Sequence, residues 1–556
     1  QVLLQAEEGG EQEVGPVDAG LQRSRPCECL FALCFALAVF GITVFLVISI
    51  IVPIVRPEYA GWYSVLLGFL GVVALGSGLY VLQIGWGAFR WTQRYRREKD
   101  TDWHARWLAA RQAWQAQGGR AGEVLEWSRV QHFVIVTNYK EDLDMLRLLA
   151  YTLMSQRTPD LCCQQISLVL AMEEREGEAA HEKAQLLREE LRPYFRDVLA
   201  TFHPPDLPED IKGKASNYRW ALAQVEAYVR RGEGRAAGLL QEYCIVHVAD
   251  ADSLYDPNFF ANVTYLFCVL PDRHRLLWQP CMLPTCNFWQ VAAPCRQVNV
   301  MIAAQEMMSA FDPLEFQIPF STYGVSLATL QHIGGCGGAA SAQDGDVITE
   351  DHHLFIKGYL ATQGRFRVHP IFLPCLNFSV GGDSKSFCGN VRDRYSQANR
   401  HMFGVSEVFY LASRLARGRY CRRRRATFGL CGWLRTLALC GKMLKIHSVP
   451  YVGLWILLGI GLVTCLKLQK TYCDSKDLEP RCQQGQQMMG KVTESRGAWI
   501  FSIATTLTVV GSIFVIVSFT RMLYVVHHTL VNIGDPNGDF MNSFDWDAAL
   551  RRPQPP

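Results

Sequence analysis

The segment Asp250-Ala251-Asp252 holds the pair of acidic side chains that is best placed to do chemistry. It follows a short apolar, partly β-branched run, Cys244 to Val248, which predicts a buried strand, and it leads into a proline-containing turn and a helix. Ligands of open α/β sheets lie beyond the carboxyl ends of the strands, and hard divalent cations take oxygen ligands while they bridge substrate phosphates. Asp250 and Asp252 are therefore candidates for holding a metal-bound nucleotide. The simpler interpretation is that Asp250 only caps the next helix.

The position of this D-x-D pair, rather than its spelling, makes it informative. Three further pairs occur at a predicted helix start, in a glycine-rich loop and in the polar C-terminal tail: Asp142/Asp144, Asp344/Asp346 and Asp545/Asp547. Chance pairs at this spacing are expected in a chain of ordinary charge content. Only Asp250/Asp252 ends a strong predicted strand.

Other polar clusters are predicted to lie at the same edge of one sheet. The apolar runs at 132–137, 166–171 and 346–348 are predicted strands in addition to the one before Asp250, and segments with a helical pattern separate them. Strands that alternate with helices predict an α/β fold with a mostly parallel sheet and one ligand cleft. The polar residues that follow these runs are Asn138 to Glu141, Glu173 and Glu174, Asp250 and Asp252, and Glu350 and Asp351.

Lys214 adds a cation to this set, because it lies at a predicted helix start, where backbone N–H groups favour phosphate. A metal, a phosphate-binding lysine and one extra acid suit the displacement of a diphosphate. The metal and the lysine absorb charge on the leaving group, while a carboxylate removes a proton from an incoming hydroxyl. The sequence contains neither G-x-x-x-x-G-K-[ST] nor G-x-G-x-x-G, which argues against a P-loop or dinucleotide enzyme.

Four motifs, taken in order, carry a resemblance to a known family. They are Lys214-Ala-Ser-Asn217, Asp250-Ala-Asp252, Thr349-Glu350-Asp351 and Gln397-Ala-Asn-Arg400-His401. In this order between apolar helices, they resemble the membrane-embedded inverting family 2 glycosyltransferases, such as cellulose, chitin and hyaluronan synthases. The resemblance runs from Gln131 to roughly Leu411. It implies a Rossmann-like GT-A catalytic domain and a nucleotide sugar donor, a UDP-sugar above all.

The resemblance also implies roles for individual residues. Asp252 would ligate Mg²⁺ or Mn²⁺ on the donor diphosphate with Asp250 beside it, Lys214 would contact the phosphates, and Asp351 would be the general base on the acceptor hydroxyl. Further nucleotide-sugar contacts would come from Thr137, Tyr139, Glu141 and Glu173. The acceptor and diphosphate side would be lined by Glu350, Gln397, Arg400 and His401.

Two positions depart from the family pattern. The family's Q-x-x-R-W ends in a tryptophan that packs beside the acceptor sugar, whereas this chain has His401. The family usually places Asp after the second strand, near the uracil, whereas this chain has Glu173 and Glu174 there. The acceptor and the nucleotide are therefore less firmly implied than sugar transfer itself.

Each candidate also has a plainer interpretation. Asp351 could be a helix N-cap, Lys214 a solvated lysine, and Gln397 and Arg400 a surface pair three residues apart. His352 and His353 suggest a metal, but solvated or core histidines are the favoured interpretation.

Long apolar stretches predict a membrane protein. The chain has 556 residues, 49 % of them hydrophobic, and spans are predicted at 30–55, 63–84, 447–466 and 499–523. Basic residues before the first span and after the second place the catalytic domain in the cytosol. The predicted order is a disordered tail (1–27), two transmembrane helices (28–92), a linker helix (93–130), the GT-A domain (131–412), a basic amphipathic interfacial helix (413–446), two transmembrane helices with an exoplasmic loop (447–526) and a C-terminal tail (527–556).

Composition narrows the partners. A net charge of +3 is too small to imply a polyanionic partner, and the arginine-rich run at 414–425 is interpreted as juxtamembrane, meeting membrane lipids rather than nucleic acid. Nineteen cysteines suggest mostly reduced thiols, although Cys473 and Cys482 could pair in the exoplasmic loop. Trp103, Trp107 and Trp114 are interpreted as a packing stripe rather than a ligand-binding aromatic box. The role of 279–320, any homo-oligomer and the compartment, plasma membrane or Golgi/ER, stay open.

The sequence thus predicts a membrane-bound transfer of sugar to a hydroxyl acceptor, above all in β-linked polysaccharide synthesis. Two alternatives remain, namely a single transfer to a lipid, and a catalytically inactive homologue that acts as a scaffold or export subunit.

Overall fold

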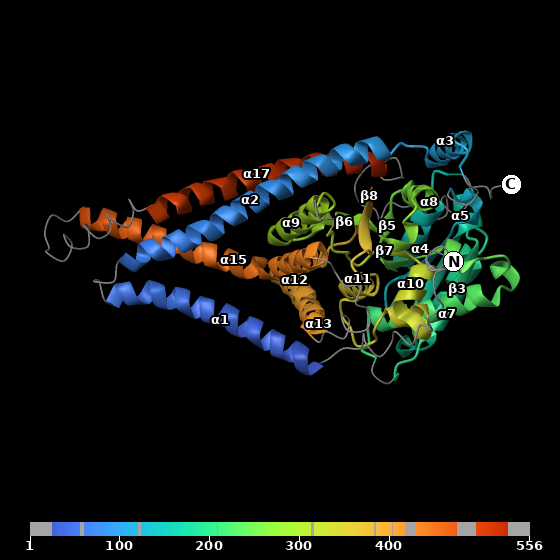
Figure 1. The fold of residues 1–556 in the computed structure, drawn as a ribbon, viewed down its shortest axis with the longest axis horizontal. Helices are drawn as coiled ribbons and strands as arrows, with labels where there is room; N and C mark the ends of the chain where they lie inside the picture. Colours follow the sequence, from blue (N-terminus) through green and yellow to red (C-terminus); the bar gives the residue numbers. More distant parts are fainter. Residues whose placement is uncertain are drawn as a thin grey trace.

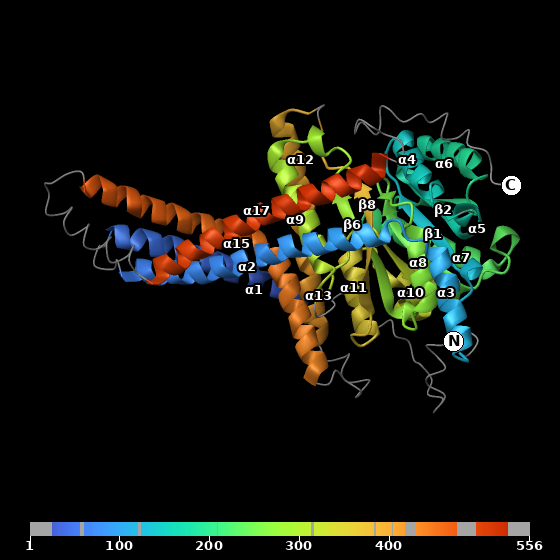
Figure 2. The same ribbon diagram turned by 90° about the horizontal axis from the view of Figure 1, so that it is seen from above.

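The structure is a computed structural model of the chain, and it describes residues 25–55, 61–119, 124–158, 160–207, 210–312, 316–382, 385–402, 404–416, 430–474 and 496–531. An α/β domain forms one end of the molecule, and four long helices extend from it to the other end (Figures 1 and 2). Most of the predicted tails, most of the arginine-rich run, Cys482 and the Asp545/Asp547 pair lie outside the described residues, whereas 25–27 and 527–531 belong to helices.

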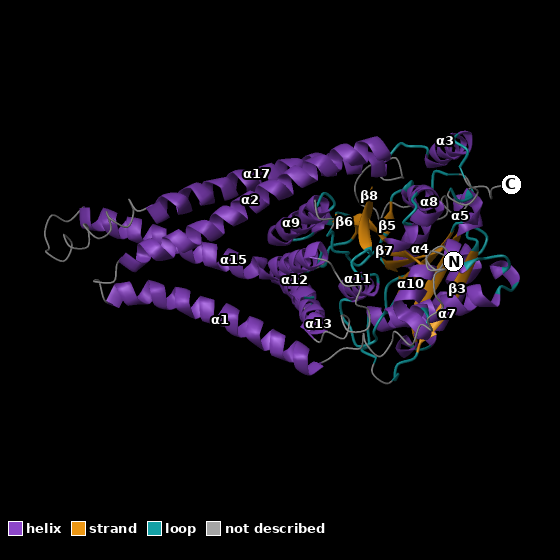
Figure 3. Cartoon of the chain, viewed as in Figure 1, coloured by secondary structure: helices purple, strands orange, loops and turns teal. Residues whose placement is uncertain are grey.

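One eight-stranded sheet, in the order β3-β2-β1-β4-β7-β6-β8-β5, organises the domain (Figure 3). Its first four strands are parallel, namely β1 (Gln131–Thr137), β2 (Ile166–Glu173), β3 (Asp197–His203) and β4 (Cys244–Asp250). The predicted strands at 132–137, at 166–171 and before Asp250 are thereby confirmed.

The second half of the sheet is mixed, so the prediction of a mostly parallel sheet holds for the first half only. β7 (Tyr323–Ser326) runs antiparallel to both β4 and β6 (Leu276–Pro284). β8 (Arg367–Asn377) runs parallel to β6, and the two-residue β5 (Leu254–Tyr255) runs antiparallel to β8.

Helices cover both faces of the sheet because alternate side chains of each strand point to opposite faces. Val134 and Val136 of β1 join a core with α4 (Leu143–Met154), α6 (Glu178–Leu191) and α8 (Phe259–Val269). Phe133 and Ile135 join a second core with α7 (Lys214–Arg231), α10 (Leu327–Gly334) and α11 (Glu350–Ala361). The remaining domain helices are α3 (Trp103–Ala116), α5 (Leu161–Gln165), α9 (Ala293–Ser309), α12 (Phe387–Met402) and α13 (Val405–Ala416).

The four long helices are α1 (Arg25–Val55), α2 (Gly61–Glu98), α15 (Leu430–Asp474) and α17 (Arg496–Val531). Within the described residues, the segments Val65–Glu98 and Trp499–Val526 are long and apolar enough to cross a membrane. The described apolar part of α1, Ala36–Ser49, is shorter. The structure thus has two candidate spans among the described residues, and the predicted flanking pairs of transmembrane helices are not supported.

Three predicted elements differ from the structure. The interfacial helix at 413–446 and the span at 447–466 are not separate, because residues 430–474 form the single helix α15. The linker is not one helix, because α2 continues to Glu98 and α3 begins anew at Trp103. The apolar step at 346–348 is not a strand, and the residues after it begin α11.

The long helix α15 is also part of the domain's own packing. Leu439 and Met443 are fully buried in the second core, and the hydroxyls of Tyr359 and Thr436 lie 3.1 Å apart. The catalytic candidate helix α11 therefore packs directly against α15.

Candidate functional site

The carboxyl ends of the parallel strands bring the predicted polar residues together. Thr137, the last residue of β1, is the register partner of Asp250, the last residue of β4. Glu173 ends β2 on the other side of β1, where Ala171 pairs with Thr137. The edge that the sequence predicted therefore exists, and its centre is the Asp250 to Asp252 turn.

Lys214 joins two of the predicted motifs through ion pairs. Its Nζ lies 2.7 Å from Asp250 Oδ1 and 2.9 Å from Glu350 Oε1, and it donates to the Ser321 carbonyl at 2.6 Å. Burial alone would lower the pKa of Lys214, but the two carboxylates outweigh it and raise this pKa. The predicted helix start at Lys214, which is the first residue of α7, is confirmed.

Asp252 is held by the backbone of a distant strand end. Its Oδ2 accepts a hydrogen bond of 3.0 Å from the Phe378 N–H, just beyond β8. Burial raises the pKa of Asp252 to about 7, and the neighbouring Asp250 carboxylate adds to the effect. Two carboxylates held this close favour a cation between or beside them.

The donor set fits a divalent cation that a substrate helps to hold. In the described part of the chain, no group of three or more His, Cys, Asp or Glu side chains could hold a metal alone. Mg²⁺ is commonly bound by one or two carboxylates together with substrate phosphates and water. Asp250 and Asp252 match that arrangement.

Glu350 and Asp351 occupy the first turn of α11, so the expectation that a strand delivers them is wrong. The segment 346–348 is not part of the sheet, and Thr349 precedes a helix with two acids in its first turn, where carboxylates are favoured by the helix dipole. Burial raises the pKa of Glu350 to about 7 although Lys214 opposes this. Asp351 is half-buried, and its Oδ1 accepts the His352 N–H at 2.8 Å.

The acceptor-side candidates lie on α12. Asp351 is within electrostatic range of His401 at the end of this helix. Gln397 accepts a hydrogen bond from Arg394, and Arg400 is exposed. His401 is therefore close enough to the candidate base to feel its charge, and Gln397 and Arg400 lie on the same helix.

The loop after β1 has a strained backbone. Lys140 has a φ of 68°, which non-glycine residues seldom adopt, and its N–H donates to Glu176 Oε2 at 3.0 Å. The Glu141 side chain turns back to accept the Tyr139 N–H at 2.5 Å. The Tyr139 ring, about one-third exposed, faces the Arg175 guanidinium at 3.8 Å from the ring centroid. The aromatic ring is thus presented at the site's edge.

Glu173 is the residue that departs from the family pattern, and its side chain is fully engaged. Its Oε2 lies 3.2 Å from Arg175 Nε and 3.3 Å from His203 Nδ1, and the carboxylate is 2 % exposed. Burial would lower the pKa of His203, but Glu173 and Asp210 raise it. At the end of β2, the side chain accessible to a ligand is therefore Arg175, which is partly exposed, rather than the buried Glu173.

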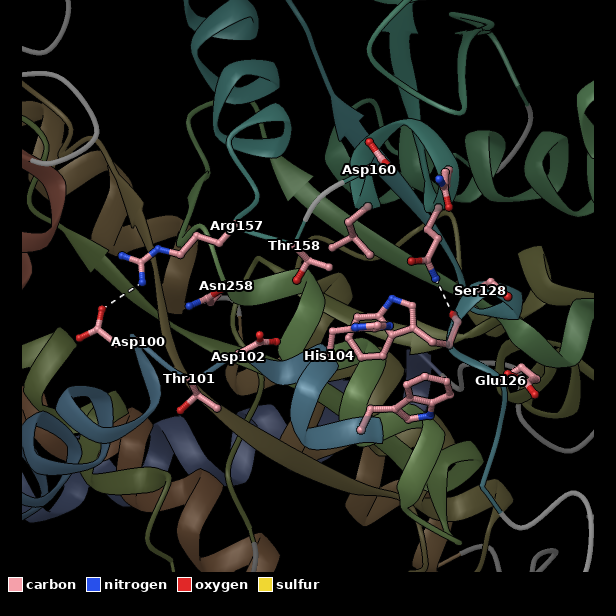
Figure 4. A pocket seen from close by; sticks show the side chains of 15 residues that line it. Asp100, Thr101, Asp102, His104, Glu126, Ser128, Arg157, Thr158, Asp160 and Asn258 are labelled. Atoms are coloured by element: carbon pink, nitrogen blue, oxygen red, sulfur yellow. Dashed lines mark hydrogen bonds and ion pairs between the residues drawn. The ribbon is translucent and has the colours of Figure 1, made fainter. Parts of the chain in front are cut away.

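The tryptophan stripe is a packing feature, as predicted for Trp103 and Trp107. The Trp103 ring lies 5.5 Å from that of Tyr265, and Trp107 Nε1 donates to the Leu125 carbonyl at 3.0 Å. Trp107 also lines a cavity of about 620 Å³ (Figure 4). Ser128 and Gln165, which precede β1 and β2, line the same cavity, so it lies at the sheet edge opposite the candidate site.

Several groups that complete the site are not apparent from the sequence. The Phe378 N–H and the Ser321 carbonyl are backbone groups, so no side-chain signal marks them. Arg175 and His203 could have been found from their places just after β2 and at the end of β3. The prediction that His353 is a core histidine is confirmed, because its side chain has no exposed surface.

Comparisons with known proteins leave the family open. No protein-family model matches the chain, and no curated protein matches it. Among solved structures, the chain is similar to the mannosyltransferase PcManGT from Pyrobaculum calidifontis, solved in complex with GDP-Man and Mn²⁺. The match has 15 % identity and a TM-score of 0.31, and it covers 71 % of this chain and 96 % of that one. A likeness this distant assigns neither fold family nor activity.

Proposed function

We propose that the chain is a membrane-bound inverting glycosyltransferase with a GT-A domain. It moves a sugar from a nucleotide sugar to a hydroxyl acceptor, in the synthesis of a β-linked polysaccharide. One observation carries the proposal. Lys214 links Asp250 at the end of β4 to Glu350 in the first turn of α11, so three motifs far apart in the sequence meet at one point.

Each side chain then has a chemical task. Asp250 and Asp252 would hold Mg²⁺ or Mn²⁺, which when bound supplies positive charge for the donor diphosphate. Lys214 already lies between acids and supplies a second cation for the same oxygens. Asp351 takes the proton of the acceptor hydroxyl while the oxygen of that hydroxyl forms a bond to the anomeric carbon of the donor sugar. The bond from that carbon to the diphosphate breaks on the opposite face, and the configuration inverts.

The donor base would lie against the loop after β1. Tyr139 offers a ring face, and Thr137, Glu141 and Glu173 lie on the strands and loop around it. His401 stands beside Asp351, where an acceptor sugar would bind, and Arg400 and Gln397 follow on the same helix.

The membrane part of the proposal has four spans in two pairs, with the catalytic domain on the cytosolic side. The two long apolar segments support it, one before and one after the domain. Basic residues in the last turn of α2 favour the same orientation.

The test is transfer from a panel of labelled UDP- and GDP-sugars by membranes that contain the full chain. Activity should require Mn²⁺ or Mg²⁺, and chelation should abolish it. Asp351→Asn should lower turnover by roughly 10²- to 10⁴-fold, the range for loss of a general base. Asp144→Asn, which changes an exposed acid of another D-x-D pair, is the matched control.

Product size distinguishes the acceptors. A ladder of products supports the polysaccharide, and one organic-extractable product would replace it with a lipid acceptor. A folded protein that binds no donor, with Asp351→Asn equal to the parent, would favour a scaffold or export subunit instead.

A further inference from the structure

A histidine two residues after the candidate base is buried between two carboxylates. His353 Nδ1 lies 2.8 Å from Glu407 Oε2, and its Nε2 lies 2.8 Å from Asp344 Oδ2. Neither the imidazole nor Glu407 has exposed side-chain surface. A neutral imidazole has one N–H and one lone pair, so it could satisfy only one of these oxygens. The geometry therefore fits the doubly protonated imidazolium between two ionised carboxylates.

The charges around His353 agree with this. Lys357, one turn further along α11, lies 2.8 Å from Asp344 Oδ1 and donates to the Ser341 carbonyl at 2.6 Å. Two carboxylates are balanced by two cations only when His353 is protonated. Burial would lower the pKa of His353, but Glu407 and Asp344 outweigh it and raise this pKa.

The group ties together three elements that the proposed reaction must hold in place. His353 belongs to α11, which begins with Glu350 and Asp351. Asp344 belongs to the loop before α11, and Glu407 belongs to α13. α13 in turn packs against α1 and α15.

The link continues back to the acceptor side along the backbone. The Glu407 N–H donates to the Gly404 carbonyl at 3.1 Å, and the Gly404 N–H donates to the His401 carbonyl at 3.0 Å. His401 ends the candidate acceptor helix α12. The Tyr410 ring lies 4.8 Å from that of His353, and the Arg414 guanidinium lies over Tyr410 at 5.0 Å. The helix of the base and the helices around the acceptor thus meet at one imidazolium.

We propose that His353 is a positioning residue, an imidazolium clamp that fixes Asp351 relative to the acceptor-side helices α12 and α13. This inference rests on the proposed function for its catalytic meaning. Donor binding depends on β1, β4 and α7, and α11 contributes to it through Glu350, whose ion pair with Lys214 is distinct from the contacts of His353 with Glu407 and Asp344.

The clamp makes stability depend on pH in one direction. His353 has a higher pKa in the folded chain than in the unfolded chain, where it is about 6.5. Its contribution to stability is therefore complete below about pH 6.5 and is lost as the pH rises through the folded-state pKa. The groups that face the ring are Glu407, Tyr410, Asp344 and Lys357, with Arg414 behind Tyr410.

The experiment uses the purified full chain and three variants, His353→Gln, Glu407→Gln and the double variant, with the exposed His332→Gln as control. His353→Gln should raise the acceptor KM at least tenfold and leave the affinity for Mn²⁺ with nucleoside diphosphate unchanged. Glu407→Gln should move the alkaline limb of the pH–rate profile to lower pH, because one charge that holds the proton is gone. The double variant should regain melting temperature relative to His353→Gln, because the only carboxylate that then faces the amide is Asp344, which Lys357 still pairs.

Melting curves from pH 5 to pH 9 separate the two proposals. If the parent transfers no sugar but only the His353 variants lose the pH dependence of melting, the clamp stands and the proposed function fails. If the parent is active and His353→Gln keeps the acceptor KM and the parental pH profiles of rate and melting, the clamp is overturned. A loss of donor affinity equal to the loss of acceptor affinity would also overturn it, because it would indicate general unfolding of the site.

Discussion

The donor half and the acceptor half of the candidate site differ in how many of their charged and polar side chains are already paired within the protein. In the donor half, Lys214, Asp250 and Glu350 are bonded to one another, and Asp252 is held by the Phe378 backbone. In the acceptor half, α12 has Asn390 as its buried residue, and Arg400 is exposed. The donor half is built into the sheet, whereas the acceptor half lies on the surface of one helix.

This difference indicates what each half must do. Charges that will meet a diphosphate are worth most when they are already oriented, since no reorganisation is then needed during the reaction. If the acceptor moves on after each transfer, as the proposed polymer synthesis requires, the acceptor side of the site must bind it weakly enough to release it. His353 lies where the two halves meet, so the clamp would hold the base to the acceptor-side helices without fixing the acceptor itself.

The largest effect in the donor half should come from Asp252→Asn. Loss of one anionic ligand should lower transfer about a hundredfold, equal to about 3 kcal/mol of charge stabilisation, and weaken Mn²⁺-dependent nucleotide binding. The melting temperature should stay equal or rise, because the variant no longer buries two neighbouring carboxylates. Calorimetric titration with Mn²⁺ and nucleoside diphosphate measures the binding, and an affinity equal to the parent's would show that the metal is not held here.

Lys214→Met should be the most destabilising change in the site. It leaves Asp250 and Glu350 facing each other, and breaking a largely buried pair on one side costs about 3 kcal/mol. Adding Glu350→Gln should recover part of this loss, since the remaining acid no longer has a neighbour of like charge. Thermal melting of the single and double variants gives the coupling. Additive losses would mean that Lys214 does not hold the two acids together.

Arg400→Ala should have the smallest effect. Because this side chain is exposed, stability should change by less than about 0.5 kcal/mol. Acceptor KM should rise several-fold while donor affinity stays the same. Arg392→Ala, an exposed arginine on the same helix, is the control. Equal behaviour of the two variants would remove Arg400 from the acceptor side.

The parallel half of the fold was predictable because its signals are local. β1, β2 and β4 are continuous apolar runs that end in polar residues, as buried parallel strands do. The mixed half was not predictable, because β6 contains Pro280 and Pro284, β8 contains Pro370 and Pro374, and β7 has four residues. Proline argues against a strand from sequence alone, and only the tertiary partners of these segments decide.

The candidate site was predictable where side chains carry the chemistry and not where packing does. The residue types at Lys214, Asp250, Asp252 and Asp351 indicated their tasks. The role of Asp344 was hidden, because its partner His353 is brought to it only by the turn before α11. Thr349 followed by two acids is a sequence signal for the helix start at Glu350. The short apolar run at 346–348 suggested a strand there instead.

The length of α15 has a consequence for how the domain stands relative to a bilayer. At 1.5 Å per residue, its 45 residues extend about 68 Å, roughly twice the hydrocarbon thickness of a membrane. Its first third is embedded in the domain through Leu439 and Met443, so one continuous helix belongs to both parts. A fragment ending at 412 would expose the apolar surface that the first third of α15 covers. In the proposed membrane topology, the distance between the site and the lipid is set by this helix rather than by a linker.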